Sequence, residues 1–286
     1  MEREEVDFKK MARVLETEWK AVRMPHAKVW NGRFTKEDTK KHIISICTTC
    51  MNRLDDLKQT LPVNIEDNIL YDNVEFVVLD YGSSNNEMYK WLTEDKRMRE
   101  YIELRLLNYY KVHGVNFYSM SHSRNVAFKV ANGSIVNNVD ADCFTNKGFA
   151  AFINRTANEC PEKAMFAKSK QLLRGRLGFY KNEFIELLGG YDESLTGYGH
   201  DDQDLMNRAW ELGFTMMPFR GTFSGCVKEH RKHLTDNFKE KRWWYSEGKN
   251  RLLSYMNLIV GKFKANKGKE WGKANLINIE GSEFSI

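Results

Sequence analysis

Three aspartates crowd into one short segment of the chain, TGYGHDDQDLMNR, which covers residues 196–208. Asp201, Asp202 and Asp204 follow directly after two glycines and a tyrosine. One acid at a helix start interacts favourably with the helix dipole, but three are more than capping requires. Crowded carboxylates repel one another, and the repulsion raises the proton affinity of one of them. The segment therefore suits a general base, and the tyrosine ring offers a face on which a sugar could stack.

A helix is predicted to begin within this acidic segment. Leu205, Ala209 and Leu212 recur on one helical face. Gly213 then ends the pattern. Capping and catalysis are compatible here, and Asp204 supports the cluster without a chemical role of its own.

A second pair of acids, Asp140 and Asp142, follows the apolar stretch SIVNNV. If the pair continues the strand, side chains two apart point the same way. Two carboxylates aimed at one point suit Mg²⁺ or Mn²⁺, especially when substrate phosphates complete the coordination shell. The alternative is a polar turn after the strand.

Two further positions carry weaker signals. Asp80 ends the run NVEFVVLD before a Gly-Ser turn, where it could bind a base or ribose, or bond neighbouring backbone amides instead. Arg124 lies in the first turn of a helix predicted over residues 121–133, with Ser121 or Ser123 as its cap. Such an arginine could bind an anion or could simply be solvated.

Histidines and cysteines were weighed as metal ligands. His230 and His233 could ligate a metal, although histidines between charged residues are more often exposed. Five cysteines, an odd number, argue against a disulfide framework. Cys47 and Cys50 form a CxxC that ends an apolar run without a second pair beside it, which favours a structural role.

Strands and helices alternate along the first half of the chain. After a helical, charged lead-in over residues 1–41, strands are predicted over residues 42–49, 73–80, 101–112 and 134–144. The segment RLDDLKQTLP after the first strand predicts a helix that stops at Pro62. This alternation predicts a mostly parallel sheet covered by helices, with ligands bound outside the carboxyl ends of the strands.

Composition and charge limit the class of protein. With 286 residues, 42% of them hydrophobic, the chain can bury a substantial α/β core. A formal net charge of +5 tolerates a phosphate-rich ligand but does not by itself point to nucleic acid. No apolar run reaches the length of a transmembrane helix, and the charged amino terminus lacks the apolar core of a signal peptide. The sequence therefore predicts a cytoplasmic location, either free or peripheral at the inner membrane face.

Taken in order, the segments TTCMNR, VVLDYGSSN, HSRN, VDAD and LLGGYDESLTGYGHDDQDLMNR resemble those of GT-A glycosyltransferases. GYGHDDQDLMNR is similar to the GWGGEDDD segment of the β-1,4-galactosyltransferase group, and the wider chain resembles the inverting family 2 transferases. The resemblance covers residues 42–235. It implies a single α/β domain with a Rossmann-like GT-A fold, in which helices flank a mixed, mostly parallel sheet.

The resemblance also implies a division of the chain. A helical extension over residues 1–41 precedes the catalytic domain. This domain has a nucleotide-binding half, residues 42–145, and an acceptor half, residues 146–235. A basic, aromatic tail follows over residues 236–286.

Donor and metal contacts follow from the matched segments. The resemblance assigns the nucleotide to Thr49, Arg53, Asp80, Arg124 and Asp140. Asp140 and Asp142 match the DxD pair that holds the metal and the donor. His230 matches a downstream histidine that completes the metal site, with His233 in reserve. The implied cofactor is Mn²⁺ or Mg²⁺, and the implied donor is a UDP-sugar.

Sugar contacts and the base follow in the same way. Gly190, Tyr198 and Asp201 match the segment that binds the sugar and the acceptor, and Asp202 matches the catalytic base. Asp201 stands where a glutamate is usual, and Thr49 stands where the family usually has a proline. The implied reaction is transfer of a hexose to the hydroxyl of a glycan or another acceptor, with inversion in one displacement. A retaining outcome stays open, because some retaining GT-A enzymes carry similar segments.

Other function classes remain as alternatives. A nucleotidyltransferase would normally show a glycine-rich phosphate loop near the first strand, and CTTCMNR contains no glycine. The tail interleaves basic and aromatic residues in FKEKRWWYSEGKNR and GKFKANKGKEWGK, which suits a nucleic-acid- or polysaccharide-binding protein. A transferase that glycosylates DNA bases would combine both features. More commonly, such a tail is an amphipathic segment packed on its domain.

Overall fold

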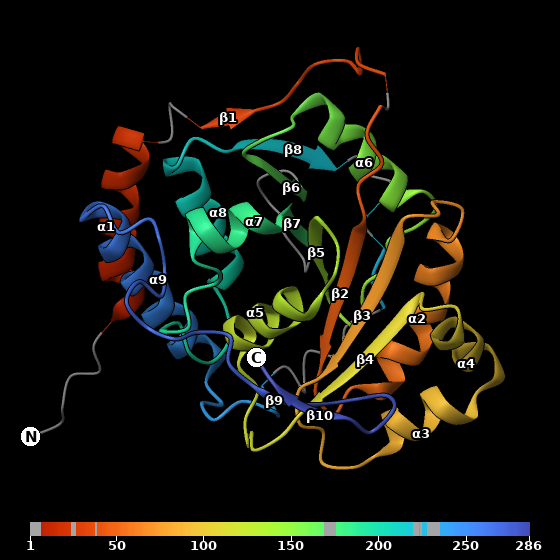
Figure 1. The fold of residues 1–286 in the computed structure, drawn as a ribbon. Helices are drawn as coiled ribbons and strands as arrows, with labels where there is room; N and C mark the ends of the chain where they lie inside the picture. The colour runs from red at the N-terminus through yellow and green to blue at the C-terminus, as the bar shows by residue number, and fades with distance from the viewer. Residues whose placement is uncertain are drawn as a thin grey trace, which may run out of the picture.

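A ten-stranded mixed sheet runs through the part of the chain that the computed structural model describes, with helices on both faces (Figure 1). The described residues are 7–23, 27–37, 39–168, 176–219, 223, 225–227 and 235–286. The strands are β1 (Lys28–Val29), β2 (Ile44–Cys50), β3 (Val74–Asp80), β4 (Leu107–Val112), β5 (Ile135–Val139), β6 (Ala164–Lys168), β7 (Arg176–Tyr180), β8 (Thr215–Phe219), β9 (Asn275–Asn278) and β10 (Glu283–Ser285).

The strand order across the sheet is β1-β8-β6-β7-β5-β2-β3-β4-β9-β10. Strands β5, β2, β3 and β4 are parallel to their neighbours within this group, whereas β7 runs antiparallel to both β5 and β6. The predicted mixed, mostly parallel α/β sheet is therefore confirmed. Because β2, β3 and β5 are parallel, their carboxyl ends meet at one edge of the sheet.

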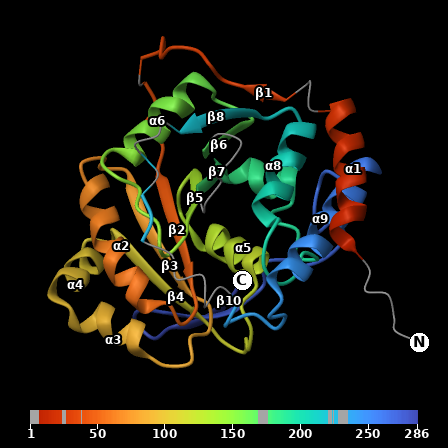
Figure 2. The ribbon, with the colours of Figure 1, turned by 180° about the vertical axis from the view of Figure 1, so that it is seen from behind.

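Helices cover the two faces of the sheet in separate groups. They are α1 (Phe8–Arg23), α2 (Leu54–Asn68), α3 (Glu87–Glu94), α4 (Lys96–Glu103), α5 (Met120–Val130), α6 (Phe149–Glu159), α7 (Lys181–Glu183) with the π-helical turn η2 (Phe184–Leu188), α8 (Asp201–Glu211) and α9 (Trp243–Ile259). Figure 2 shows the same groups from behind.

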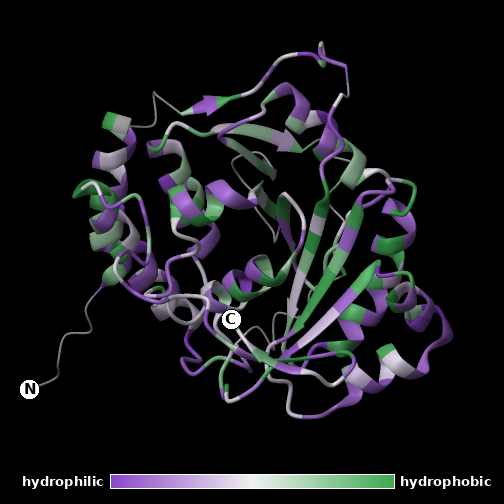
Figure 3. Ribbon diagram, viewed as in Figure 1, coloured by the Kyte–Doolittle hydropathy of each residue, from purple (hydrophilic) through white to green (hydrophobic). Residues whose placement is uncertain are grey.

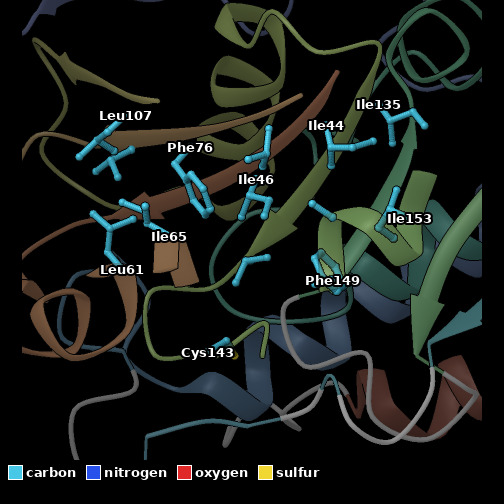
Figure 4. Close-up of a cluster of buried hydrophobic side chains, with 14 of the residues drawn as sticks. Ile44, Ile46, Leu61, Ile65, Phe76, Leu107, Ile135, Cys143, Phe149 and Ile153 are labelled. Atoms are coloured by element: carbon cyan, nitrogen blue, oxygen red, sulfur yellow. The ribbon is translucent and has the colours of Figure 1, made fainter. Parts of the chain in front are cut away.

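Alternation along the strands builds a core on each face. On β2, Ile44 and Ile46 pack with residues of α2, α3, α4 and α6, as Figure 4 shows for part of this cluster. Cys47, also on β2, belongs to the opposite core, which α5, η2, α8 and α9 complete. Figure 3 shows hydrophobic residues concentrated along the central strands. Strands buried on both faces explain why the sequence shows continuous apolar runs here.

Several element boundaries predicted from sequence are wrong, and the strand predicted over residues 134–144 ends already at Val139. Helix α2 continues through Pro62 to Asn68, because Leu61 and Ile65 are buried in the core and their packing outweighs the lost hydrogen bond. The strand predicted over residues 101–112 is divided: α4 runs to Glu103, and β4 begins only at Leu107.

Helix α5 begins earlier than predicted. Ser119 is its cap and accepts a hydrogen bond from the backbone N–H of His122 at 3.4 Å, so neither Ser121 nor Ser123 has this role. Arg124 therefore lies in the second turn of the helix and not in the first.

The segment predicted as a tail is integrated into the domain. Helix α9 packs along α1, and the two helices lie side by side in both views (Figures 1 and 2). Strand β9 pairs antiparallel with β4 and extends the sheet. No described helix has the length and apolar character needed to cross a membrane.

Candidate active site

Buried Arg124 on α5 joins the two acidic segments found in the sequence. Its Nη2 donates to Asp140 Oδ1 at 3.0 Å, and its Nη1 donates to Asp202 Oδ1 at 3.1 Å. Nη1 also donates a short hydrogen bond to Asp201. The Arg124 side chain is only 2% exposed. The Arg124 guanidinium thus holds the end of β5 against the start of α8, and its burial strengthens each charged contact.

Asp202 has the electrostatic surroundings of a base. Burial raises its pKa to about 7, with further contributions from the nearby Asp201 and Asp140 carboxylates, while Arg124 opposes the rise. The Tyr191 hydroxyl donates to Asp202 Oδ1 at 3.1 Å. A carboxylate whose pKa is close to 7 can accept a proton from a substrate at physiological pH.

The start of α8 is fixed by its neighbours. Asp201 is buried at the first position of the helix, where burial raises its pKa although Arg124 opposes the shift. Asp204 accepts from Arg208 Nε at 2.7 Å, and the pair is buried. Arg208 in turn donates to the backbone carbonyl of Gly190 at 3.0 Å. Asp204 therefore has a structural role, in which it holds Arg208 against the Gly190 carbonyl, as the sequence suggested.

Asp140 and Asp142 lie in a turn just after β5 and no longer on the strand. The backbone N–H of Cys143 donates to the Asp140 carbonyl at 2.9 Å and closes this turn. Among the described residues, the ligand atoms of Asp140, Asp142 and Cys143 all lie within 4.8 Å of one another. The turn thus brings the Asp140 and Asp142 carboxylates close together, as was expected if both lay on one strand.

The donor set fits a hard divalent cation. Burial and the neighbouring Asp140 raise the pKa of Asp142, as expected for two carboxylates that lie close together in a partly buried site. Burial acts in the same direction on Asp140, but Arg124 and a hydrogen bond from Asn138 hold its pKa below the ordinary value. The Cys143 thiol shares a hydrogen bond with the Cys226 thiol and is buried, and both effects raise its pKa. Cys143 therefore stays protonated, and the two carboxylates are the fitting ligands.

A cavity of about 180 Å³ opens beside these acids. Six of the residues singled out from the sequence line it: Thr49, Arg53, Arg124, Asp140, Asp142 and Tyr198. Arg53 Nη2 lies 3.3 Å from Asp142 Oδ2, at the mouth of this cavity. Cations and carboxylates therefore share the wall that a phosphorylated ligand would meet.

Four of the sequence candidates in the described structure do not line this cavity: Asp201 and Asp202, which bond Arg124, and Asp80 and Gly190. Asp80 is fully buried and accepts from the Ser83 backbone N–H at 2.8 Å and from the Tyr109 hydroxyl at 3.1 Å, which is the turn-forming alternative considered above. Gly190 packs against Trp271 and Asn125 and has a positive φ of 76°. Neither lines the cavity. His230 and His233 lie outside the described residues.

Sequence reasoning missed several residues of the site. Tyr118 shares a hydrogen bond of 2.5 Å with Thr49 Oγ1 and lines the cavity. Asn237 and Phe238, from the segment predicted as a tail, line it as well. Tyr191 stands in the quoted segment LLGGYDE, so its position beside the acids was the available signal, whereas Asn237 gave none.

Part of the sequence matches a protein-family model. Residues 156–233 match the model described as "N-terminal domain of galactosyltransferase". This stretch includes Asp201 and Asp202 but not Asp140 or Asp142. No curated protein is significantly similar to the chain.

Solved structures resemble the chain over most of its length. The mannosyltransferase PcManGT from Pyrobaculum calidifontis, in complex with GDP-Man and Mn²⁺, has a TM-score of 0.55 at 15% identity, with 88% of this chain and 86% of that chain covered. TarS 1–349 from S. aureus, in complex with UDP-GlcNAc, has a TM-score of 0.53 at 14% identity, with 77% and 66% covered. GalNAc-T7 with UDP, GalNAc and Mn²⁺ has a TM-score of 0.50 at 13% identity, with 72% of this chain and 50% of that chain covered. The chain has the GT-A glycosyltransferase fold.

Proposed function

We propose that the chain is a metal-dependent glycosyltransferase that moves a hexose from a nucleotide sugar, with UDP as the expected nucleotide, to an acceptor hydroxyl. The observation that carries this proposal is the junction made by Arg124. It joins a carboxylate pair suited to a divalent cation, Asp140 and Asp142, with a base whose pKa lies near neutrality, Asp202. A donor sugar and an acceptor must meet between two such groups.

Asp140 and Asp142 are the residues that would hold Mn²⁺ or Mg²⁺. Such a cation supplies neutralisation of the charge that builds on a departing diphosphate. Arg53 lies beside Asp142 with its side chain 47% exposed, so it is available to an anionic ligand in the cavity. Thr49 and Tyr118 also line the cavity, and the nucleoside is expected beside them.

Asp202 takes the proton from the acceptor hydroxyl as its oxygen attacks the anomeric carbon. General base catalysis of this kind contributes about 10²–10⁴-fold to the rate. Arg124 and the Tyr191 hydroxyl fix the orientation of the Asp202 carboxylate. Attack opposite the leaving diphosphate gives inversion in one displacement. Tyr198 lines the same cavity and is our candidate for a ring that contacts the transferred sugar.

The alternative of a nucleic-acid-binding protein loses its main support. Most of the first basic, aromatic stretch that suggested it lies in α9, which packs against α1, and the second stretch lies between α9 and β9, which pairs with β4. Neutral acceptors such as glycans remain consistent with the site.

Calorimetric titration of UDP and GDP, with and without Mn²⁺, tests the assignment of the metal and donor residues. Wild type is expected to bind UDP more tightly when Mn²⁺ is present, because Asp140 and Asp142 would hold the cation and it would supply positive charge to the diphosphate. Asp142→Asn should abolish this gain, and Asp202→Asn should keep it. Asp72→Asn, an exposed aspartate paired with Lys41, is the matched control. A gain that survives in Asp142→Asn would refute the metal assignment.

A further inference from the structure

A second cavity lies between α1, α8 and α9, apart from the donor cavity described above. Its volume is about 410 Å³, which is within the usual size range of small-ligand sites. These three helices lie together in both views of the fold (Figures 1 and 2). The cavity exists because the amino-terminal helix, which lies outside the GT-A resemblance, packs across the helix that carries Asp202.

Aromatic rings and balanced charges line this second cavity. Trp19, Trp210 and Tyr255 contribute rings, and each is less than a tenth exposed. Two glutamates, one lysine and one arginine add charges that sum to zero: Glu16, Glu247, Lys20 and Arg251. A charged ligand would meet like charges here, whereas a neutral ligand could use both the donors and the acceptors.

Three buried nitrogen atoms on lining residues have no hydrogen-bond partner among the described residues. They are Trp210 Nε1, His200 Nε2 and Asn207 Nδ2. Trp210 is only 8% exposed, so its N–H is withdrawn from solvent. Burial, assisted by Arg251, lowers the pKa of His200 to about 3, and its ring is therefore neutral. A buried donor without a partner is costly, and a ligand hydroxyl would remove that cost once a small shift of the Trp210 side chain exposes its N–H to the cavity.

We propose that this cavity binds a neutral saccharide unit. A sugar ring presents apolar faces to aromatic side chains and many hydroxyls to mixed donors and acceptors, which matches the rings and the balanced charges of the lining. The inference rests on the proposed function in one respect, because it assigns the bound unit to the acceptor. His200 lines this cavity and directly precedes Asp201 and Asp202, while Tyr198 lines the donor cavity. The loop over residues 197–200 thus stands between the two cavities.

The indole N–H of Trp210 provides a direct test by NMR. The full chain, labelled with ¹⁵N, is titrated with maltose, lactose, cellobiose and chitobiose, and the Trp210 signal is assigned by its loss in Trp210→Phe. At least one of these disaccharides is expected to shift the Trp210 signal. Trp210→Phe keeps an aromatic ring, although a smaller one, and lacks the donor, and it should bind that disaccharide about tenfold more weakly. Trp244→Phe, in which an exposed tryptophan of α9 is replaced, should bind like wild type.

Thermal unfolding of the free variants separates binding from stability. Trp210→Phe also removes volume from a buried site, so a lower unfolding temperature is expected from the cavity alone. The binding comparison is therefore made at a temperature at which this variant is folded, and unchanged disaccharide binding by the folded variant would overturn the inference.

Three further outcomes would also overturn it: no shift with any of the four disaccharides, the same shift with UDP, or a larger shift with inorganic phosphate or glucuronate. The titration requires no transfer reaction. A failure here therefore differs from a failure of the proposed function, which would appear as loss of metal-dependent UDP binding.

Discussion

At the residue scale, the site depends on one buried arginine that serves three carboxylates. Asp140, Asp201 and Asp202 all contact Arg124, so three negative charges face a single positive one. Burial is the largest cause of the raised pKa values of Asp142 and Asp202. The neighbouring carboxylates add to it in both cases, and Arg124 opposes the rise at Asp202.

Neutralising Asp202 should stabilise the metal-free protein at alkaline pH. Its pKa in the folded state, about 7, lies above the ordinary value of 3.8. The folded protein therefore holds this proton more tightly than the unfolded chain, and the stability it brings is lost as pH rises through about 7. In EDTA, Asp202→Asn should raise the free energy of unfolding by roughly 1–3 kcal/mol at about pH 8.

The gain should shrink at about pH 5, where wild-type Asp202 is itself protonated in the folded state. Denaturant unfolding at the two pH values measures the difference. Asp72→Asn is the control, because Lys41 lowers the pKa of this exposed aspartate and the sign is opposite. A gain for Asp202→Asn that is equal at both pH values would show that the Asp202 charge is not the cause.

At the scale of elements, the start of α8 is set by the loop and the π-helical turn before it. Gly189 and Gly190 follow η2 with positive φ angles, and Arg208 on α8 donates to the carbonyl of Gly190. Asn266 donates to the carbonyl of Gly189 at 2.8 Å. The glycine pair thus shapes the wall behind the acids and does not line the donor cavity.

Gly190→Ala should destabilise the protein more than Gly261→Ala. Both glycines have a φ of 76°, so an alanine pays a similar backbone cost of about 1–2 kcal/mol at each. A Cβ on Gly190 would also lie 2.5 Å from Trp271 and 2.7 Å from Asn125, whereas one on Gly261 meets nothing within 4 Å. Overpacking should add about 1–3 kcal/mol at Gly190. Urea unfolding measures both variants, and equal losses would contradict the packing argument.

At the scale of the whole molecule, α1 near the amino end and α9 and β9 near the carboxyl end pack against the α/β domain. Trp19 on α1 donates to Glu211 on α8 at 2.6 Å, and Arg251 on α9 bonds Glu16 on α1. Toward the other edge of the sheet, β9 from the carboxyl-terminal segment pairs with β4. Residues that resembled an extension and a tail are therefore structural.

Trp19→Ala should cost about 3–5 kcal/mol of stability, as expected for a large side chain that is only 4% exposed. Trp244→Ala, at 49% exposure on the neighbouring helix α9, should change stability by no more than about 0.5 kcal/mol. Denaturant titration of the two variants makes the comparison. A similar small change in both would mean that α1 is a detachable extension.

The sequence predicted the alternating sheet and the acidic clusters because both have local signals. Apolar runs mark β2 and β3, and adjacent aspartates mark the start of α8. It did not predict that Arg124 joins the clusters, because that contact spans 77 residues. Nor did it predict Tyr118 and Asn237 in the cavity, since only tertiary packing brings them beside Thr49 and Met51. The prediction of one strand over residues 101–112 was wrong because the end of α4 and the whole of β4 lie in one segment rich in leucine and tyrosine.

Release of nucleoside diphosphate from a panel of nucleotide sugars tests the central claim most directly. UDP-glucose, UDP-galactose, UDP-GlcNAc and GDP-mannose are incubated with the protein and Mn²⁺, and water replaces the acceptor. We predict release from at least one UDP-sugar that EDTA and Asp142→Asn abolish and that Asp202→Asn slows by about 10²–10⁴-fold. Asp72→Asn should release it at the wild-type rate. No release from any donor, or release that persists in EDTA, would contradict a metal-dependent glycosyltransferase built on Asp140, Asp142 and Asp202.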